Sequence, residues 1–362
     1  MYKNKAVFYS IAILLFLGTE TLACTSFTLR NKTQVLVGKN LDWAIDQGLV
    51  IINKKGIAKK AWLNKSEKPM EWVSKYGSIT FNQFGKEFPV GGMNEKGLVV
   101  EELNFWETSY PSEDKRKAIN ELQWIQYQLD NAKNIDEVLA SDSVLRISKF
   151  LFNIHYLITD SQGNTVIIEF YKGKMRHFTN DRYPVSVLAN NSYKTSLKSL
   201  SYFEEMEDTS KIPQTYSTRF YTTWKMMNAY TDNQSIIDYS FQILEAIKDE
   251  KETQWSIVYD IKNLKIYFKT RTQERVKTIA FQSFNFSFKQ TSLFFDINHN
   301  NDDSIQSHFT PYSNSQNRAF LEHVYKEYVK HHIIEAEKAN LTLKKQLKYL
   351  DNCCGILIKN EL

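Results

Sequence analysis

Alternation of apolar and polar positions indicates β-strands over much of the chain after residue 24. Residues 25–30 (TSFTLR) and 34–38 (QVLVG) flank a polar turn at 31–33, a pattern typical of a β-hairpin. Further strands are expected at 97–103, 156–160, 165–170, 185–189, 255–259 and 266–269. Short turns join several of these segments, so we expect antiparallel pairing.

Apolar spacing of three and four residues predicts helices between these strands. They are expected at 118–131, after Asn134, at 218–230, after Ser235 and, as one long charged helix, at about 318–350. Strand clusters interleaved with helices predict an α+β fold, with two antiparallel sheets and helices outside them. No linker interrupts the pattern, so residues 24–362 are expected to form a single domain.

Residues 1–23 have the pattern of a secretory signal peptide. Lys3 and Lys5 precede an apolar run at 6–18, and the small residue Ala23 closes the segment. The run is shorter than the roughly 20 residues that a membrane-spanning helix needs. We therefore expect a bacterial protein that is exported, to the periplasm or outside the cell, and is soluble once the leader is removed.

Cleavage after Ala23 would make Cys24 the first residue, with a free α-amine beside its thiol. An α-amine titrates near 7.7–8.0, so at neutral pH it can accept the thiol proton. Nucleophile and base would then lie on one residue. Two other interpretations stay open: a cysteine that lies there by chance, and the lipidated cysteine of a lipoprotein, which the order of Thr21, Leu22 and Ala23 disfavours.

Composition narrows the classes of function. The chain has 362 residues, of which 42% are hydrophobic and 14% aromatic, typical of a globular protein with a large core. A net charge of +5, spread without a basic run, gives no reason to expect nucleic acid as a partner. Seven histidines lack metal-ligand spacing, so neither a metal nor another cofactor is expected, and His155 is expected to be packed in a strand. Cys353 and Cys354 could bond to each other or to another chain.

Several short motifs resemble the choloylglycine hydrolase family, the N-terminal-nucleophile amidases that include bile salt hydrolases and penicillin V acylases. They keep the order of that family between residue 24 and about residue 285. The motifs are 24–27 (CTSF) with 38–43 (GKNLDW), 94–98 (NEKGL) with 103–105 (LNF), 187–190 (VLAN), 217–220 (STRF) and a late strand pair at 253–270. The resemblance implies a four-layer α-β-β-α sandwich and an amidase that forms an acyl-thioester.

The resemblance also implies roles for individual residues. Cys24 would be the nucleophile and its α-amine the base, and Asp42 would orient that amine. Asn104 would donate to the oxyanion, Asn190 would hold the oxyanion and substrate region, and Arg219 would brace the site. Taken one by one, Asp42 would be a turn residue and the two asparagines ordinary loop residues. Only the ordered set favours catalysis.

Lys39 departs from the family pattern, which has arginine there in many members. An ammonium is a compact point charge and does not replace a planar guanidinium, although it can still lower the pKa of a nearby thiol. The alternative is a solvated lysine on the strand surface. An active site with altered geometry around Cys24 is the interpretation that we carry forward.

The substrate is the least constrained prediction. Trp43 and Trp106 flank the catalytic motifs and could line an apolar acyl pocket, although core packing would explain them as well. The resemblance implies a small acyl-amide substrate of the bile salt, penicillin V or N-acyl-homoserine lactone type, and self-association as a homotetramer. Two other hypotheses are a lipid-anchored or soluble binding protein without catalysis on the same fold, and acyl transfer to an amine in place of water.

Overall fold

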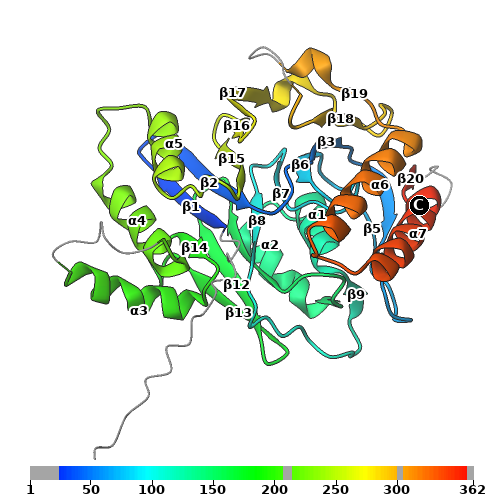
Figure 1. Ribbon diagram of the computed structural model, residues 1–362, viewed down its shortest axis with the longest axis horizontal. Helices are drawn as coiled ribbons and strands as arrows, with labels where there is room; N and C mark the ends of the chain where they lie inside the picture. Colours follow the sequence, from blue (N-terminus) through cyan, green and yellow to red (C-terminus); the bar gives the residue numbers. More distant parts are fainter. Residues whose placement is uncertain (1–23, 207–213, 300–304, 357–362) are drawn as a thin grey trace, which may run out of the picture.

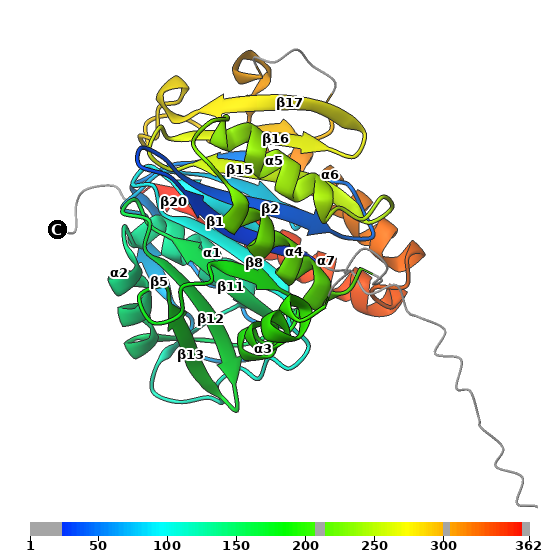
Figure 2. The same cartoon turned by 90° about the vertical axis from the view of Figure 1, so that its left-hand side faces the viewer.

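The computed structural model describes residues 24–206, 214–299 and 305–356. Residues 1–23, where we predict a signal peptide, lie outside the described residues. Two antiparallel sheets face each other at the centre of the molecule, with helices on both outer sides (Figures 1 and 2). The predicted α+β architecture is confirmed.

The first sheet contains the N-terminal hairpin. In spatial order its strands are β14 (Val187–Ala189), β1 (Thr25–Arg30), β2 (Val35–Asp42), β15 (Thr253–Asp260), β16 (Lys265–Thr270) and β17 (Gln273–Ala280). The turn between β1 and β2 closes as the sequence predicts, because the Asn31 side chain accepts hydrogen bonds from the main-chain N–H groups of Thr33 and Gln34. This short turn fixes the register of the hairpin, which pairs Ser26 with Lys39.

The second sheet packs face to face against the first. Its order is β13 (Lys174–Thr179), β12 (Thr165–Tyr171), β11 (Ile154–Thr159), β8 (Val99–Asn104), β7 (Gly91–Asn94), β6 (Ser78–Asn82), β3 (Leu49–Asn53), β18 (Leu293–Asp296) and β19 (Thr310–Pro311). The predicted turn before β8 needs Gly97, which has a positive φ of 77°. Asn94 secures that turn by accepting from the N–H groups of Lys96 and Leu98.

Aromatic side chains fill the space between the sheets. Phe81 of β6 contacts Trp255 and Tyr259 of β15 and Phe268 of β16, with ring centroids 5.6–6.4 Å apart. All four side chains are almost completely buried. Their contacts hold the two sheets face to face.

Helices cover both outer faces. The first sheet carries α3 (Tyr193–Glu204), α4 (Tyr216–Ala229) and α5 (Ile236–Ala246), and α4 and α5 lie in front of β1 and β2 in Figure 2. On the other side α1 (Glu121–Asn131) packs against β7 and β8, and α2 (Ile135–Ala140) follows it. Asn134 caps α2 and Ser235 caps α5, as predicted.

The predicted single helix at 318–350 is wrong. Two helices occupy this region, α6 (Asn314–Lys330) and α7 (Ala336–Asn352), and they pack against each other (Figure 1). The chain turns at His332, which has a positive φ of 55°. Histidine and β-branched residues such as Ile333 and Ile334 favour helix less than their Lys- and Glu-rich neighbours do, so the break falls where local propensity is weakest.

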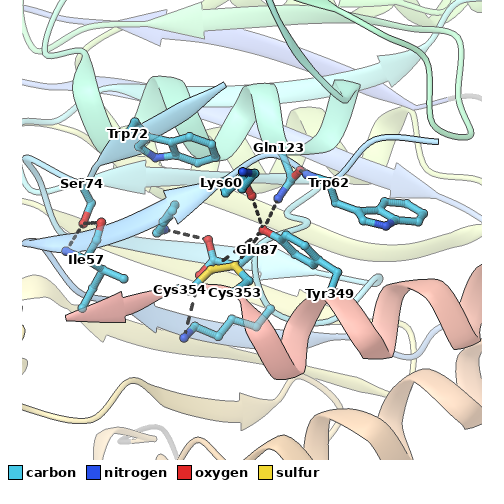
Figure 3. Close-up of a disulfide and its surroundings, with 12 residues drawn as sticks. Ile57, Lys60, Trp62, Trp72, Ser74, Glu87, Gln123, Tyr349, Cys353 and Cys354 are labelled. Atoms are coloured by element: carbon cyan, nitrogen blue, oxygen red, sulfur yellow. Dashed lines mark hydrogen bonds and ion pairs between the residues drawn. A yellow bond between two sulfur atoms is a disulfide. The ribbon is translucent and has the colours of Figure 1, made fainter. Parts of the chain in front are cut away.

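Smaller elements tie the C-terminal end to the domain. A three-stranded sheet joins β4 (Ile57–Lys60), β5 (Glu71–Val73) and β20 (Gly355–Ile356), and a second small sheet joins β9 (Lys117–Ile119) and β10 (Leu145–Ile147). Short 3-10 turns lie at Ser141–Ser143, Phe281–Ser283 and Gln306–His308. Cys353 and Cys354 form a disulfide within the chain, next to Tyr349 (Figure 3). Tyr349 donates to the carbonyl of Lys60 at 2.7 Å and accepts from Gln123 of α1 at 2.8 Å.

Candidate active site

Cys24 lies directly before β1 and is 4% exposed. Its thiol donates to the main-chain carbonyl of Asp42 at 3.6 Å. The strand pairing brings the other predicted residues to it: Thr25 pairs with Ala189, which places Asn190 at the end of β14, and the hairpin places Lys39 and Asp42 on β2. Segments far apart in the sequence thus meet around one thiol.

Burial dominates the acidity of this thiol. It raises the pKa of Cys24 to about 12, although the Lys39 ammonium opposes this effect. Asp42 and Glu102 raise the pKa further, because a second negative charge beside them is unfavourable. The thiol therefore stays protonated at neutral pH and needs a base beside it to become a thiolate.

Asp42 is completely buried and is held from two sides. The Arg219 guanidinium of α4 donates to one carboxylate oxygen through Nη1, and the Thr253 hydroxyl donates to the other. Arg219 also approaches Asp249, with Nη2 3.7 Å from Oδ2. Burial raises the pKa of Asp42, while Arg219 and Thr253 oppose the shift. Arg219 therefore bridges two carboxylates, those of Asp42 and Asp249.

Lys39 is 1% exposed, so the alternative of a solvated strand lysine is wrong. Its ammonium donates to the main-chain carbonyl of Glu102 and lies 4.0 Å from Oε2 of Glu101. Burial by itself would lower the pKa of Lys39, but the acidic groups of Cys24, Glu102 and Glu101 outweigh it and raise the pKa. Lys39 is a buried cation beside the thiol.

The two predicted asparagines lie together but are oriented differently. Asn104 ends β8, and its side chain lines the same pocket as Cys24. Asn190 uses its Nδ2 to donate to the main-chain carbonyl of Asn104 at 2.7 Å. Asn104 thus lies at the pocket, whereas Asn190 holds the end of β8 in position.

An apolar pocket opens beside the thiol. The space inside it, including its open mouth, is about 340 Å³. Besides Cys24 and Asn104, its lining consists of six apolar side chains and two polar ones: Leu41, Trp43, Phe84, Val90, Leu122, Phe152, Gln83 and Glu102.

Of the two tryptophans predicted to line this pocket, only one lies there. Trp43 does line it, and its indole N–H donates to the Tyr328 hydroxyl of α6 at 3.2 Å. Trp106 does not: its side chain is 72% exposed, on the loop that follows β8. Trp106 lies away from the pocket because the chain leaves the sheet after Asn104.

Sequence reasoning missed Thr253, Asp249, Glu102 and Tyr328. Only Glu102 left a signal, since residues 101–102 place two acidic side chains inside an otherwise apolar strand. Such a pattern indicates buried charge, which needs a partner or a function.

His155 is packed, as predicted: it is fully buried in β11 and its ring stacks on Phe105. Within residues 24–206, 214–299 and 305–356, no group of three or more His, Cys, Asp or Glu side chains is arranged to hold a metal ion. Across the same ranges, no helix combines the length and apolar character needed to span a bilayer.

The fold and the buried Cys24 agree with one class of protein, the linear amide C–N hydrolases. The sequence profile of that class matches residues 24–296. The chain belongs to the choloylglycine hydrolase family.

Characterised relatives agree with this assignment. The chain is 26% identical over 236 residues to a penicillin V acylase from Pectobacterium atrosepticum, which covers 59% of this chain and 61% of the relative. It is 29% identical over 182 residues to a bile salt hydrolase/transferase from Clostridium perfringens, with 46% and 53% covered. The match thus spans between half and two thirds of these relatives.

Solved structures share the fold. A penicillin V acylase from Agrobacterium tumefaciens superposes with a TM-score of 0.70 at 21% identity, covering 80% of this chain and 98% of the other. A mutant of the conjugated bile acid hydrolase from Clostridium perfringens gives a TM-score of 0.63 at 20% identity, with 78% and 98% covered. These superpositions confirm the predicted fold, two antiparallel sheets with helices outside them.

Proposed function

We propose that this chain is an exported cysteine amidase that hydrolyses linear amide C–N bonds, with Cys24 as its N-terminal nucleophile once residues 1–23 have been removed. The observation that carries the proposal is the meeting of a buried thiol, a buried lysine and an arginine-held carboxylate at the end of an apolar pocket. Family membership gives the reaction class.

Activation follows from the chemistry of the new N-terminus. Removing Ala23 would place an α-amine two bonds from the Cys24 side chain, and this amine can take the proton that the buried thiol otherwise retains. The Lys39 ammonium lowers the pKa of the thiol and so favours the same transfer. Asp42, fixed by Arg219, supplies a negative charge that favours the protonated amine.

The reaction then proceeds in two steps. The thiolate attacks the amide carbonyl carbon, a C–S bond forms, and the carbonyl oxygen becomes an oxyanion that the Asn104 side-chain NH₂ can stabilise. The protonated α-amine returns its proton to the leaving nitrogen, the C–N bond breaks, and an acyl-thioester on Cys24 remains. Water, deprotonated by the same amine, attacks the thioester, so the acid leaves and the thiol is restored.

The pocket favours an apolar acyl group. Trp43, Phe84 and Phe152 surround the space next to the thiol and offer large aromatic contact areas. Penicillin V, bile salts and N-acyl-homoserine lactones are the substrate types that we would test first. Self-association as a homotetramer is a further expectation, which light scattering on the purified protein tests.

The experiment that tests this proposal is the intact mass of the protein purified from the compartment to which it is exported, before and after brief alkylation. The expected result is a chain that begins at Cys24 and carries one rapidly alkylated thiol. A mass that retains residues before Cys24, or that includes a fatty acyl group on it, contradicts the proposal, since no free α-amine would then exist.

A further inference from the structure

The side chain of Glu102 has no role in the mechanism above, although it lies in the same pocket as Cys24. It is 8% exposed on β8, two positions before Asn104, and so lies on the same face of the strand. The small exposed part of Glu102 opens into the pocket that it lines with Cys24 and Asn104.

The carboxylate of Glu102 lacks a partner in the described part of the chain. No hydrogen bond to its side-chain oxygens is found there, and no cation lies within 4.0 Å of them. Lys39 contacts the main-chain carbonyl of Glu102 and the side chain of Glu101 instead. The oxygens of Glu102 still reach the open space of the pocket, so a ligand that displaces water from them must supply a donor in its place, because a buried carboxylate without a donor costs free energy.

The neighbouring polar groups do not supply that donor. Glu101 accepts from the Tyr259 hydroxyl on the opposite face of β8. Glu121 accepts from three main-chain N–H groups, at 2.6–2.7 Å. Gln83, the other polar side chain of the lining apart from Asn104, donates its Nε2 to the carbonyl of Ile45 at 3.1 Å. Glu102 is therefore the acidic group of the pocket that is left available to a ligand.

The local balance of charge favours a cation there. Lys39 and Arg219 supply two positive charges at the site, and the protonated α-amine of a matured Cys24 would add a third, against the four carboxyl groups of Asp42, Asp249, Glu101 and Glu102. Burial raises the pKa of Glu102 to about 7, and Lys39 limits the shift. Near neutral pH, a positive group bound beside Glu102 is thus sufficient to hold it in the carboxylate form.

We infer that Glu102 is a specificity-determining residue that selects substrates whose apolar acyl group carries a hydrogen-bond donor near the scissile carbonyl, a protonated amine above all. The inference rests on the proposed function in one respect, that the pocket at Cys24 receives the acyl group. Aromatic walls would hold the ring or chain of such an acyl group, and Glu102 would accept from its amine. This assigns amino-acyl amides as the substrate class.

Binding to a Cys24→Ala variant tests the inference without turnover. Calorimetry at pH 7 compares two matched pairs of primary amides, 2-phenylacetamide with phenylglycinamide, and 3-phenylpropanamide with 3-amino-3-phenylpropanamide. In at least one pair the amine should bind about tenfold tighter or more, the effect expected of a charge-assisted hydrogen bond in a desolvated site. Equal binding within both pairs overturns the inference.

Two further variants on the same background assign any preference to its source. Glu102→Gln keeps the shape but removes the charge, so the amine preference should fall to about twofold or less. Glu101→Gln changes an equally buried neighbour that faces away from the pocket and should retain the preference. A preference that survives Glu102→Gln contradicts the role of this residue.

The two proposals can fail separately. A preference for amines in a protein whose wild type hydrolyses no amide would overturn the proposed function while supporting the role of Glu102. Hydrolysis of amides by the wild type, with no preference in either pair, would support the proposed function and overturn the role of Glu102.

Discussion

Two clusters of buried charge lie in this molecule, and they differ in what their carboxylates face. The site cluster consists of Lys39, Asp42, Glu101, Glu102 and Arg219. The support cluster, near the C-terminal disulfide, consists of Lys59, Glu87 and Asp130, and Glu87 is visible in Figure 3. All of these side chains are nine-tenths buried or more.

In the support cluster every charge has an opposite partner. Lys59 Nζ lies 2.8 Å from Glu87 and 2.9 Å from Asp130, and Asp130 also accepts from the Trp72 indole N–H at 2.8 Å. No carboxylate of this cluster lines the pocket at Cys24. In the site cluster, by contrast, Glu102 faces the pocket without a partner. Burial of charge therefore does not by itself distinguish the proposed active site, whereas an available carboxylate beside the Cys24 thiol does.

The largest difference between the clusters should appear in turnover. Asp42→Asn removes the negative charge opposite Arg219, so we expect a loss of rate of about 10³-fold, comparable to the loss of one oxyanion donor. Release of the amine product measures it. The matched change in the support cluster is Asp130→Asn, which should leave the rate per folded molecule within about twofold of the wild-type rate. If Asp130→Asn lost as much rate as Asp42→Asn, the two clusters would not differ in their effect on turnover.

Substitutions in the support cluster should lower the stability of the fold. Asp130→Asn leaves the buried Lys59 with one carboxylate in place of two and weakens the bond from Trp72, so we expect the free energy of unfolding to fall by about 2 kcal/mol. Denaturant unfolding followed by tryptophan fluorescence measures this change. A change below about 0.5 kcal/mol would mean that water reaches this cluster and screens it.

The pH dependence of stability should reveal the site cluster. Burial raises the pKa of Glu101 to about 8 and that of Glu102 to about 7, whereas both groups titrate near 4.5 when unfolded. The folded state then binds more protons than the unfolded state between about pH 4.5 and 8, so stability falls as pH rises through this window, by up to about 1.4 kcal/mol per pH unit for each carboxyl.

Unfolding measured at pH 5.5, 6.5 and 7.5 tests this slope. Glu102→Gln should make it shallower between pH 5.5 and 7, because one of the two titrating groups is gone. An unchanged slope in this variant would contradict a raised pKa at Glu102.

The smallest effect is expected where the two regions communicate. Tyr328 of α6 accepts from Trp43, and its ring stacks on Phe84 with centroids 5.4 Å apart, so a C-terminal helix supports two walls of the pocket. Tyr328→Phe keeps the ring and removes one hydrogen bond, which costs about 1 kcal/mol. We expect a severalfold rise in KM with little change in kcat, and an unchanged KM would mean that α6 does not influence the pocket.

Local signals in the sequence were sufficient for the elements that short-range interactions determine. The turn at Asn31, the cap at Ser235 and the glycine turn at Gly97 depend on neighbouring residues and were predictable. The single helix at 318–350 was wrong because the helical pattern continues through a break of weak propensity. Trp106 was misplaced because proximity in sequence does not fix the direction in which a loop leaves a sheet.

The site was predictable only where ordered motifs marked it. Cys24, directly before β1, lies together with Asp42 of β2 and Arg219 of α4. Thr253 and Tyr328 contact the site from distant segments through a hydroxyl group or a ring, and such contacts leave no periodic trace in the sequence. Glu102 was visible as an acidic residue in an apolar strand, but its lack of a partner emerges only in three dimensions.

The most direct test of the account is to trap the acyl group on the nucleophile. The mature protein is mixed with an amide that it hydrolyses, quenched with acid within milliseconds to seconds, and digested for mass spectrometry. The account predicts that the N-terminal peptide beginning at Cys24 gains the mass of the acyl group less one hydrogen, and that Cys24→Ala neither gains this mass nor turns the amide over. Full turnover by Cys24→Ala, or an acyl group found on another residue, would contradict it.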